Sequence, residues 1–69
     1  MLTADQLVRH YTAQELAECA EREVRQRKVR YANRVLTGRM SQQQADVEIA
    51  RMQAIGAWLR EEAERERLI

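Results

Sequence analysis

One helix-start signal occurs three times in this chain and divides it into segments. The signal is the capping box, in which a Ser or Thr hydroxyl accepts a hydrogen bond from the backbone N–H of the residue three positions later. That residue is Glu or Gln, and its side chain accepts a hydrogen bond from the backbone N–H of the Ser or Thr. The pairs are Thr3 with Gln6, Thr12 with Glu15 and Ser41 with Gln44. Because the sequence has no proline and only two glycines, these starts predict helices over about 4–10, 13–36 and 42–66.

The link between the two long helices decides how they pack. Gly38 is expected to end the second helix, since the position after a helix end often needs a left-handed backbone that glycine adopts without strain. Two helices about 36 Å long, joined by a few residues, must run antiparallel. We therefore predict an all-α fold, with a single domain spanning 1–69 that forms an antiparallel helical hairpin after a short N-terminal helix.

Apolar residues in the long helices recur in alternating steps of three and four, the heptad pattern of packed helices. This pattern predicts a core and dimer seam made by Leu16, Val24, Tyr31, Val35, Ile49, Met52, Gly56 and Leu59. A glycine inside a helix costs about 1 kcal/mol relative to alanine. Gly56 therefore indicates close approach of a bulky neighbour such as Tyr31, or of a crossing helix.

A second apolar band lies on the third helix, roughly opposite the seam. Its members are Val47, Ala50, Ala54, Ala57 and Trp58. One partner helix in the same chain cannot cover both bands, so the second must meet another copy, the short first helix or a different protein. A chain of 69 residues with a single cysteine has little other stabilisation. We favour a homodimer that forms a four-helix bundle.

Charge is unevenly distributed, with about −3 over residues 1–21, +6 over 22–39 and −2 over the remainder. Partner-binding candidates are the basic side chains of the middle block, Arg22, Arg25, Arg27, Lys28, Arg30 and Arg34, together with Trp58. Arg22 and Arg25 lie on one side of the helix with Val29 and Leu36, whereas the remaining arginines lie on another. A solvated surface, an acidic protein partner and nucleic acid are the three interpretations.

Catalytic and metal-binding patterns are missing from the sequence. It has no Gly-rich phosphate loop, no Ser/His/Asp set and no Cys/His metal spacing. His10 fits an exposed or capping residue, and Cys19 a partly buried helix residue in an acidic setting that disfavours a thiolate. We expect no enzymatic activity, no cofactor and no metal. The lack of a signal peptide or a membrane span predicts a complete, cytoplasmic protein.

A further pattern is formed by Tyr31, Val35, Gly38, Met40, Ser41, Ala45, Ile49, Met52 and Ile55. In this spacing the chain resembles a group of small helical-hairpin proteins from temperate phages and prophages. The pattern covers less than half of the chain and departs from the group at Ala32, where a proline often follows the tyrosine. Its matching residues are core, turn and cap positions.

The resemblance implies a phage protein that takes part in host takeover by binding and inhibiting or modulating a host protein in the host cytoplasm. In size and helicity the chain is similar to a phage anti-activator type that blocks quorum-sensing transcriptional regulators of the LuxR class and can engage a pilus motor ATPase. The alternative from the residues themselves is a small dimeric nucleic-acid-binding regulator that uses the basic second helix.

Overall fold

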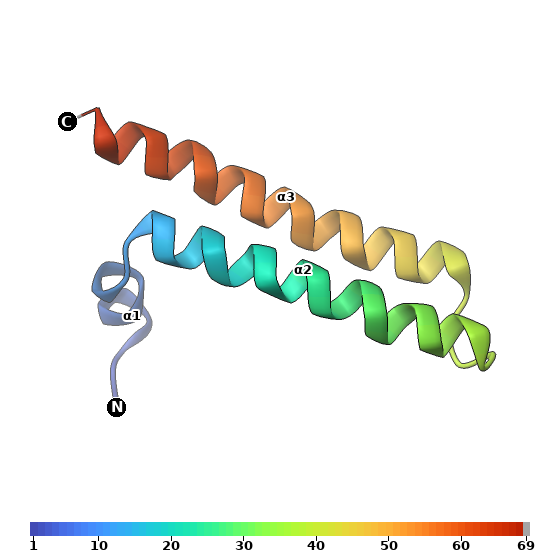
Figure 1. Ribbon diagram of the computed structural model, residues 1–69. Helices are drawn as coiled ribbons and strands as arrows, with labels where there is room; N and C mark the ends of the chain where they lie inside the picture. Colours follow the sequence, from blue (N-terminus) through green and yellow to red (C-terminus); the bar gives the residue numbers. More distant parts are fainter. Residues whose placement is uncertain (69) are drawn as a thin grey trace.

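The computed structural model describes residues 1–68, which form three helices: α1 (Ala4–His10), α2 (Ala13–Leu36) and α3 (Gln42–Arg67). No strand is present in this part of the chain. The two long helices lie side by side and antiparallel, and both chain termini lie toward the same end of the pair (Figure 1). The prediction of an all-helical chain with two long packed helices is confirmed; Ile69, the end of the expected domain, lies outside the described residues.

Each helix begins at the capping box expected from the sequence. At α2 the Thr12 hydroxyl accepts from the Glu15 backbone N–H at 3.1 Å, and the Glu15 carboxylate accepts from the Thr12 backbone N–H at 3.4 Å. The pairs at α1 and α3 make the same reciprocal bonds, at 2.8 to 3.3 Å. These bonds satisfy backbone donors that have no partner inside a helix.

The turn after α2 is built around Gly38, whose φ of +75° is left-handed. The Gly38 backbone N–H donates to the Val35 carbonyl at 3.1 Å, and the Arg39 N–H donates to the Arg34 carbonyl at 2.8 Å. This pair of bonds is the Schellman motif, which closes a helix and reverses the chain. As a result, α3 runs antiparallel to α2.

Small residues line the contact between the long helices. Buried positions are Ala13, Ala17, Ala20, Ala45, Gly56 and Ala63, and no larger side chain within residues 1–68 is fully buried. Seven of the predicted seam residues, Leu16, Val24, Tyr31, Val35, Ile49, Met52 and Leu59, are half-buried at the edges of this contact. The eighth, Gly56, is buried. A hairpin of two helices therefore has a narrow core.

The neighbour of Gly56 differs from the bulky residue named in the sequence analysis. A Cβ added to Gly56 would lie 3.6 Å from the Ala20 Cβ and 3.9 Å from the Glu21 Cγ. Tyr31 cannot fill that place, because eleven residues of helix put it about 16 Å farther along α2. The crossing helix was the correct alternative.

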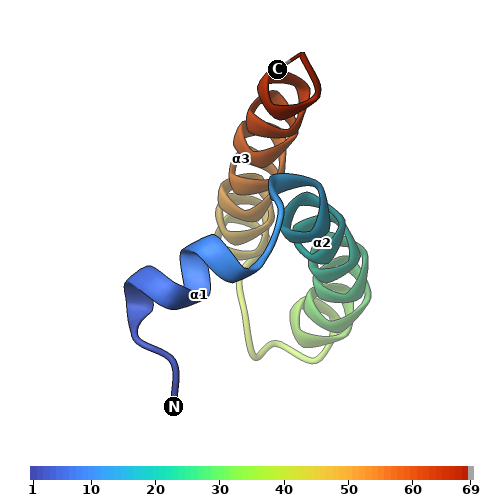
Figure 2. The ribbon, with the colours of Figure 1, turned by 90° about the vertical axis from the view of Figure 1, so that its left-hand side faces the viewer.

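Helix α1 stands apart from the hairpin. Among the described residues it makes no packing contact with α2 or α3 and it buries none of its own side chains. In the view along the hairpin, α1 projects to one side of the two long helices (Figure 2). Its apolar side chains, and those of the residues next to it, remain exposed at Leu2, Leu7, Val8 and Tyr11.

Alanine substitutions at the two glycines should have opposite effects. At Gly56 the new Cβ meets its neighbours at ordinary van der Waals distance, so Gly56→Ala should raise the free energy of unfolding by up to about 1 kcal/mol through helix propensity. At Gly38 the left-handed backbone makes the same change unfavourable by about 1 kcal/mol. Urea denaturation followed by circular dichroism measures both, and a loss of stability in Gly56→Ala would show that a Cβ does not fit between α2 and α3 at this contact.

Candidate interaction surfaces

A shallow apolar groove runs between the long helices on one side of the hairpin. We call it the groove face; its lining residues are Leu16, Cys19, Ala20, Glu23, Arg27, Met52, Ile55 and Leu59. Ile55 is 46% exposed, and Trp58, which follows three residues later on α3, is 60% exposed. Cys19 is exposed here, whereas the sequence analysis expected partial burial. Nothing within the described chain covers this apolar surface.

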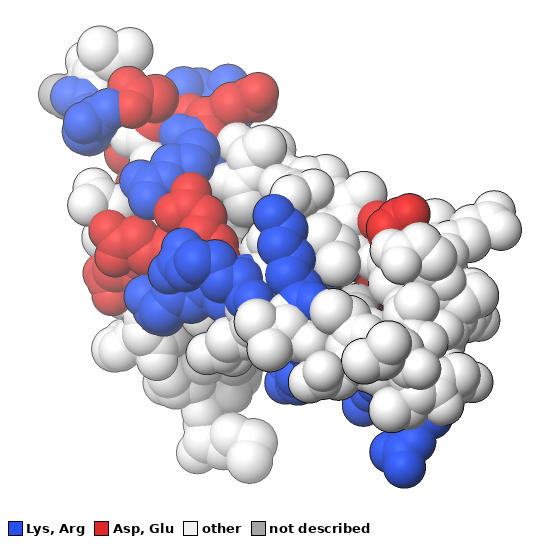
Figure 3. Space-filling model, turned by 45° about the vertical axis from the view of Figure 1, so that its right-hand side comes forward, with Lys and Arg blue, Asp and Glu red and all other residues white. Residues whose placement is uncertain are grey.

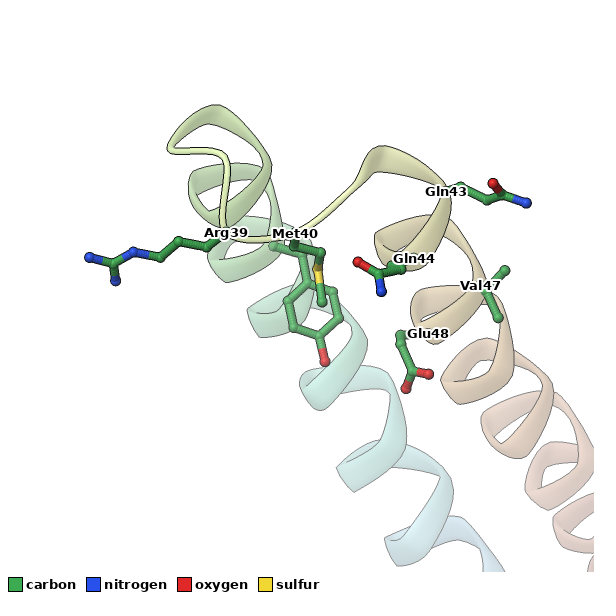
Figure 4. Close-up of a pocket in the computed structure, with 7 residues that line it drawn as sticks. Arg39, Met40, Gln43, Gln44, Val47 and Glu48 are labelled. Atoms are coloured by element: carbon green, nitrogen blue, oxygen red, sulfur yellow. The ribbon is translucent and has the colours of Figure 1, made fainter.

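The groove face continues toward the turn as a second hollow. It is lined by Tyr31, Arg39, Met40, Gln43, Gln44, Val47 and Glu48. Gln44 and Glu48 precede Met52 at intervals of four, so they share its side of α3. In Figure 4 the side chains of Met40, Gln44 and Glu48 point into the space between the helices, and Arg39 points away. The groove face therefore extends from the chain ends to the turn.

A charged cluster interrupts the apolar seam at Arg27. This side chain is half-buried, and its Nε donates to Glu23 Oε1 at 2.9 Å. Arg30 donates to the same oxygen at 2.9 Å. The hydrogen bond from Arg27 has the larger effect in lowering the pKa of Glu23 below its usual value, and the bond from Arg30 adds to it. The same bond to Glu23 raises the pKa of Arg27. A single carboxylate therefore offsets part of the charge of two candidate partner-binding residues.

On the other side of the hairpin, Glu21 and Arg60 join the two long helices. Arg60 Nε donates to Glu21 Oε2 at 2.8 Å, and its Nη2 donates to Oε1 at 2.7 Å. This is the only ion pair between α2 and α3 within residues 1–68. The hydrogen bond from Arg60 lowers the pKa of Glu21. Arg25 also lowers this pKa through its charge, but it forms no ion pair within residues 1–68.

The six basic candidates therefore do not act as one surface. Arg27 and Arg30 are paired with Glu23. No carboxylate within residues 1–68 forms an ion pair with the other four, Arg22, Arg25, Lys28 and Arg34. The Arg34 guanidinium lies 5.9 Å from the centroid of the Tyr31 ring, within the range of a cation–π contact.

Two of the unpaired arginines of α2, Arg22 and Arg25, share a stripe with exposed apolar residues. We call it the outer α2 face; it consists of Arg22, Arg25, Val29, Ala32 and Leu36, and all five are exposed. Figure 3 shows charges of both signs mixed over the half of the molecule that carries the chain ends, and a larger uncharged area toward the turn. Val29 and Leu36 share this side of the helix with the arginines, as their spacing predicted, but they were not among the predicted site residues. Their exposure became visible only once α3 was placed.

Other functional features are few in the part of the chain that the structure describes. Over residues 1–68 no group of three or more His, Cys, Asp or Glu side chains could hold a metal ion. None of the described helices has the length and apolar character needed to cross a bilayer. Comparisons of the chain with protein-family models, curated proteins and solved structures found no significant match. The groove face and the outer α2 face are therefore the candidate functional features of this chain.

The two paired glutamates predict how stability depends on pH. Their pKa values are lowered in the folded chain relative to the ordinary 4.5, so their contribution is present above that value and is lost as the pH falls below it. The free energy of unfolding should decrease between about pH 5 and pH 3. Urea titrations over this range should give a shallower dependence for Glu21→Gln/Glu23→Gln than for the wild type. Equal slopes would show that these pairs do not stabilise the fold.

Proposed function

We propose that this chain is a non-enzymatic, phage-encoded helical protein that dimerises and binds a host protein in the cytoplasm, inhibiting or modulating it by covering a surface. The supporting observation is the apolar surface that the hairpin leaves uncovered. Its fully buried residues are alanines and a glycine, while Met52 and Leu59 are half-buried and Ile55 and Trp58 are exposed. A chain of 69 residues has little stability to spare, so further burial of this surface would stabilise it.

A second copy is the simplest cover for the groove face. Two hairpins that bring their groove faces together make a four-helix bundle, and the same patch then serves both subunits. This arrangement would remove Leu16, Met52, Ile55 and Leu59 from water. Fully burying an exposed side chain of this size contributes about 1.5 to 3 kcal/mol. The gain at Leu16, Met52 and Leu59 is smaller, because the hairpin already half-buries them.

The charge distribution supports an antiparallel arrangement of the two copies. The half of the hairpin with the chain ends, residues 1–24 and 55–68, has nine acidic and five basic residues, a net charge of −4. The half with the turn, residues 25–54, has seven basic and two acidic residues, a net charge of +5. In an antiparallel dimer each acidic half faces a basic half, whereas a parallel dimer would place like charges together.

The resemblance to phage hairpin proteins suggests which host proteins to examine first. These are a quorum-sensing transcriptional regulator of the LuxR class and a pilus motor ATPase. Dimerisation through the groove face would leave the opposite side of α2 free for such a partner. The proposal thus separates the surface that makes the dimer from the surface that meets the host.

The alternative is a small dimeric nucleic-acid-binding regulator. The observation in its favour is the set of unpaired basic side chains on α2. Against it, Glu23 neutralises part of the charge at Arg27 and Arg30, and aromatic residues for base stacking are scarce, with two tyrosines and one tryptophan in the chain. Binding that falls steeply with salt would characterise this alternative.

Substitution in the groove face should convert the dimer to a monomer. Ile55→Asp would place a charge in the proposed interface, where burial without a partner is strongly unfavourable. Sedimentation equilibrium should show a dimer for the wild type and a monomer for this variant. Val29→Asp is the matched control, because Val29 is also an exposed aliphatic residue but lies on the outer α2 face. A wild type that remains monomeric, or equal effects of both variants, would contradict the proposed interface.

Host binding is tested by affinity capture from bacterial lysate treated with nuclease, followed by mass spectrometry. A host protein recovered in stoichiometric amount supports the proposal, and a LuxR-class regulator should then lose operator binding when the purified chain is added. The control is Arg9→Glu, a charge reversal on the detached α1. Recovery of nucleic acid before nuclease treatment, with no protein afterwards, would favour the alternative.

A further inference from the structure

The outer α2 face has a composition that neither the hairpin nor the proposed dimer explains. Its residues recur in steps of three and four, at 22, 25, 29, 32 and 36, the spacing with which one helix packs along another. Val29 is 66% exposed and Leu36 is 84% exposed. The stripe lies mainly on the side of α2 away from α3, with Arg25 at its edge beside Gln53 and Ala57 of α3. Dimerisation through the groove face would therefore leave Val29 and Leu36 uncovered.

Free positive charge lies next to these apolar residues. Arg25, Gln26, Val29 and Arg30 together enclose a shallow hollow on this side of α2. Glu21 pairs with Arg60, and Arg25 acts on that carboxylate through its charge without forming an ion pair within residues 1–68. Lys28 has no acidic residue three or four positions away on its helix, where such pairs form. The cations beside the stripe are therefore available to a partner.

We propose that the outer α2 face binds an acidic amphipathic α-helix of a partner protein. The apolar residues of that helix would pack on Val29, Ala32 and Leu36, and its flanking carboxylates would pair with the free cations Arg22, Arg25 and Lys28. Recognition of a helix by an apolar stripe with charged flanks is a recurrent mode of protein association. The inference rests on the proposed interaction function and adds the surface and the chemical class of the partner.

Nucleic acid would contact only the charged residues of the outer α2 face. Phosphates would engage the cations, but they would leave Val29 and Leu36 in water. An acidic helix accounts for both the charge and the exposed aliphatic side chains. It also accounts for the heptad spacing, which contacts along a phosphate backbone do not require.

The test is a binding titration followed by fluorescence anisotropy. The probe is a labelled three-heptad peptide with Leu at positions a and d and Glu at positions e and g, and the control peptide has Lys in place of Glu. The full-length chain should bind the Glu peptide saturably and the Lys peptide far more weakly. Val29→Gln/Leu36→Gln should weaken binding by about tenfold or more, as expected when buried aliphatic contacts are lost.

Charge-reversal variants separate local pairing from net charge. Arg25→Glu should weaken binding of the Glu peptide, whereas Arg51→Glu, an equal change in charge at an exposed residue of α3, should leave it unchanged. Equal loss in both variants would show attraction by net charge alone and overturn the inference. Equal binding of the two peptides would also overturn the inference. So would a loss of peptide binding in Ile55→Asp without a loss in Val29→Gln/Leu36→Gln, because the peptide would then bind the groove face.

Two further results distinguish this inference from the proposal on which it rests. If Val29→Gln/Leu36→Gln captures the host protein as well as the wild type does, the inference is wrong while the proposed function stands. If an RNA or DNA duplex binds through Arg25 and the Glu peptide does not, the surface serves nucleic acid and the inference is wrong. If the wild type is monomeric and captures no host protein, the proposed function itself fails.

Discussion

The close approach of α2 and α3 at Ala20 and Gly56 governs the rest of this molecule. Small side chains at this contact let the two backbones come together, so that even a Cβ at Gly56 would lie at van der Waals distance from Ala20. Bulky seam residues such as Met52 and Leu59 are therefore displaced to the edges, where they are half-buried. A core made in this way stabilises the hairpin only modestly, because the apolar area removed from water is small. The same geometry creates the groove face.

Two glutamates then determine which cations remain available. Glu21 and Glu23 lie on opposite sides of the α2 seam; Glu21 pairs with Arg60 across the hairpin, and Glu23 pairs with Arg27 and Arg30 on its own helix. Such exposed pairs contribute little to stability individually. Their larger effect is on the surface charge, since they distinguish a neutralised side of α2 from one that retains its positive charge.

Local signals were enough to predict the helix starts and the turn. A capping box or a left-handed glycine depends on residues within a few positions of each other, so Thr12, Ser41 and Gly38 could be interpreted without knowing the tertiary structure. The core contacts of Ala13 and Ala17 were missed, because alanine contributes weakly to a hydrophobic pattern and is equally common on helix surfaces.

Other features depended on information that no short stretch contains. The neighbour of Gly56 follows from the register of the hairpin, which the turn sets from almost twenty residues away. Likewise, the partner of Glu21 is Arg60, a residue on the other helix. Patterns along one helix could group the arginines by side, but they could not show which of them would find a carboxylate.

The detachment of α1 has a consequence for how assembly could be observed. This helix has 7 residues, well below the length at which an isolated helix is stable in water, and its capping box is separate from that of α2. Its backbone amides should therefore exchange with solvent rapidly until something covers Leu7 and Val8. Protection of these amides would report directly that another surface had covered α1, and it would show at which stage of complex formation this happens.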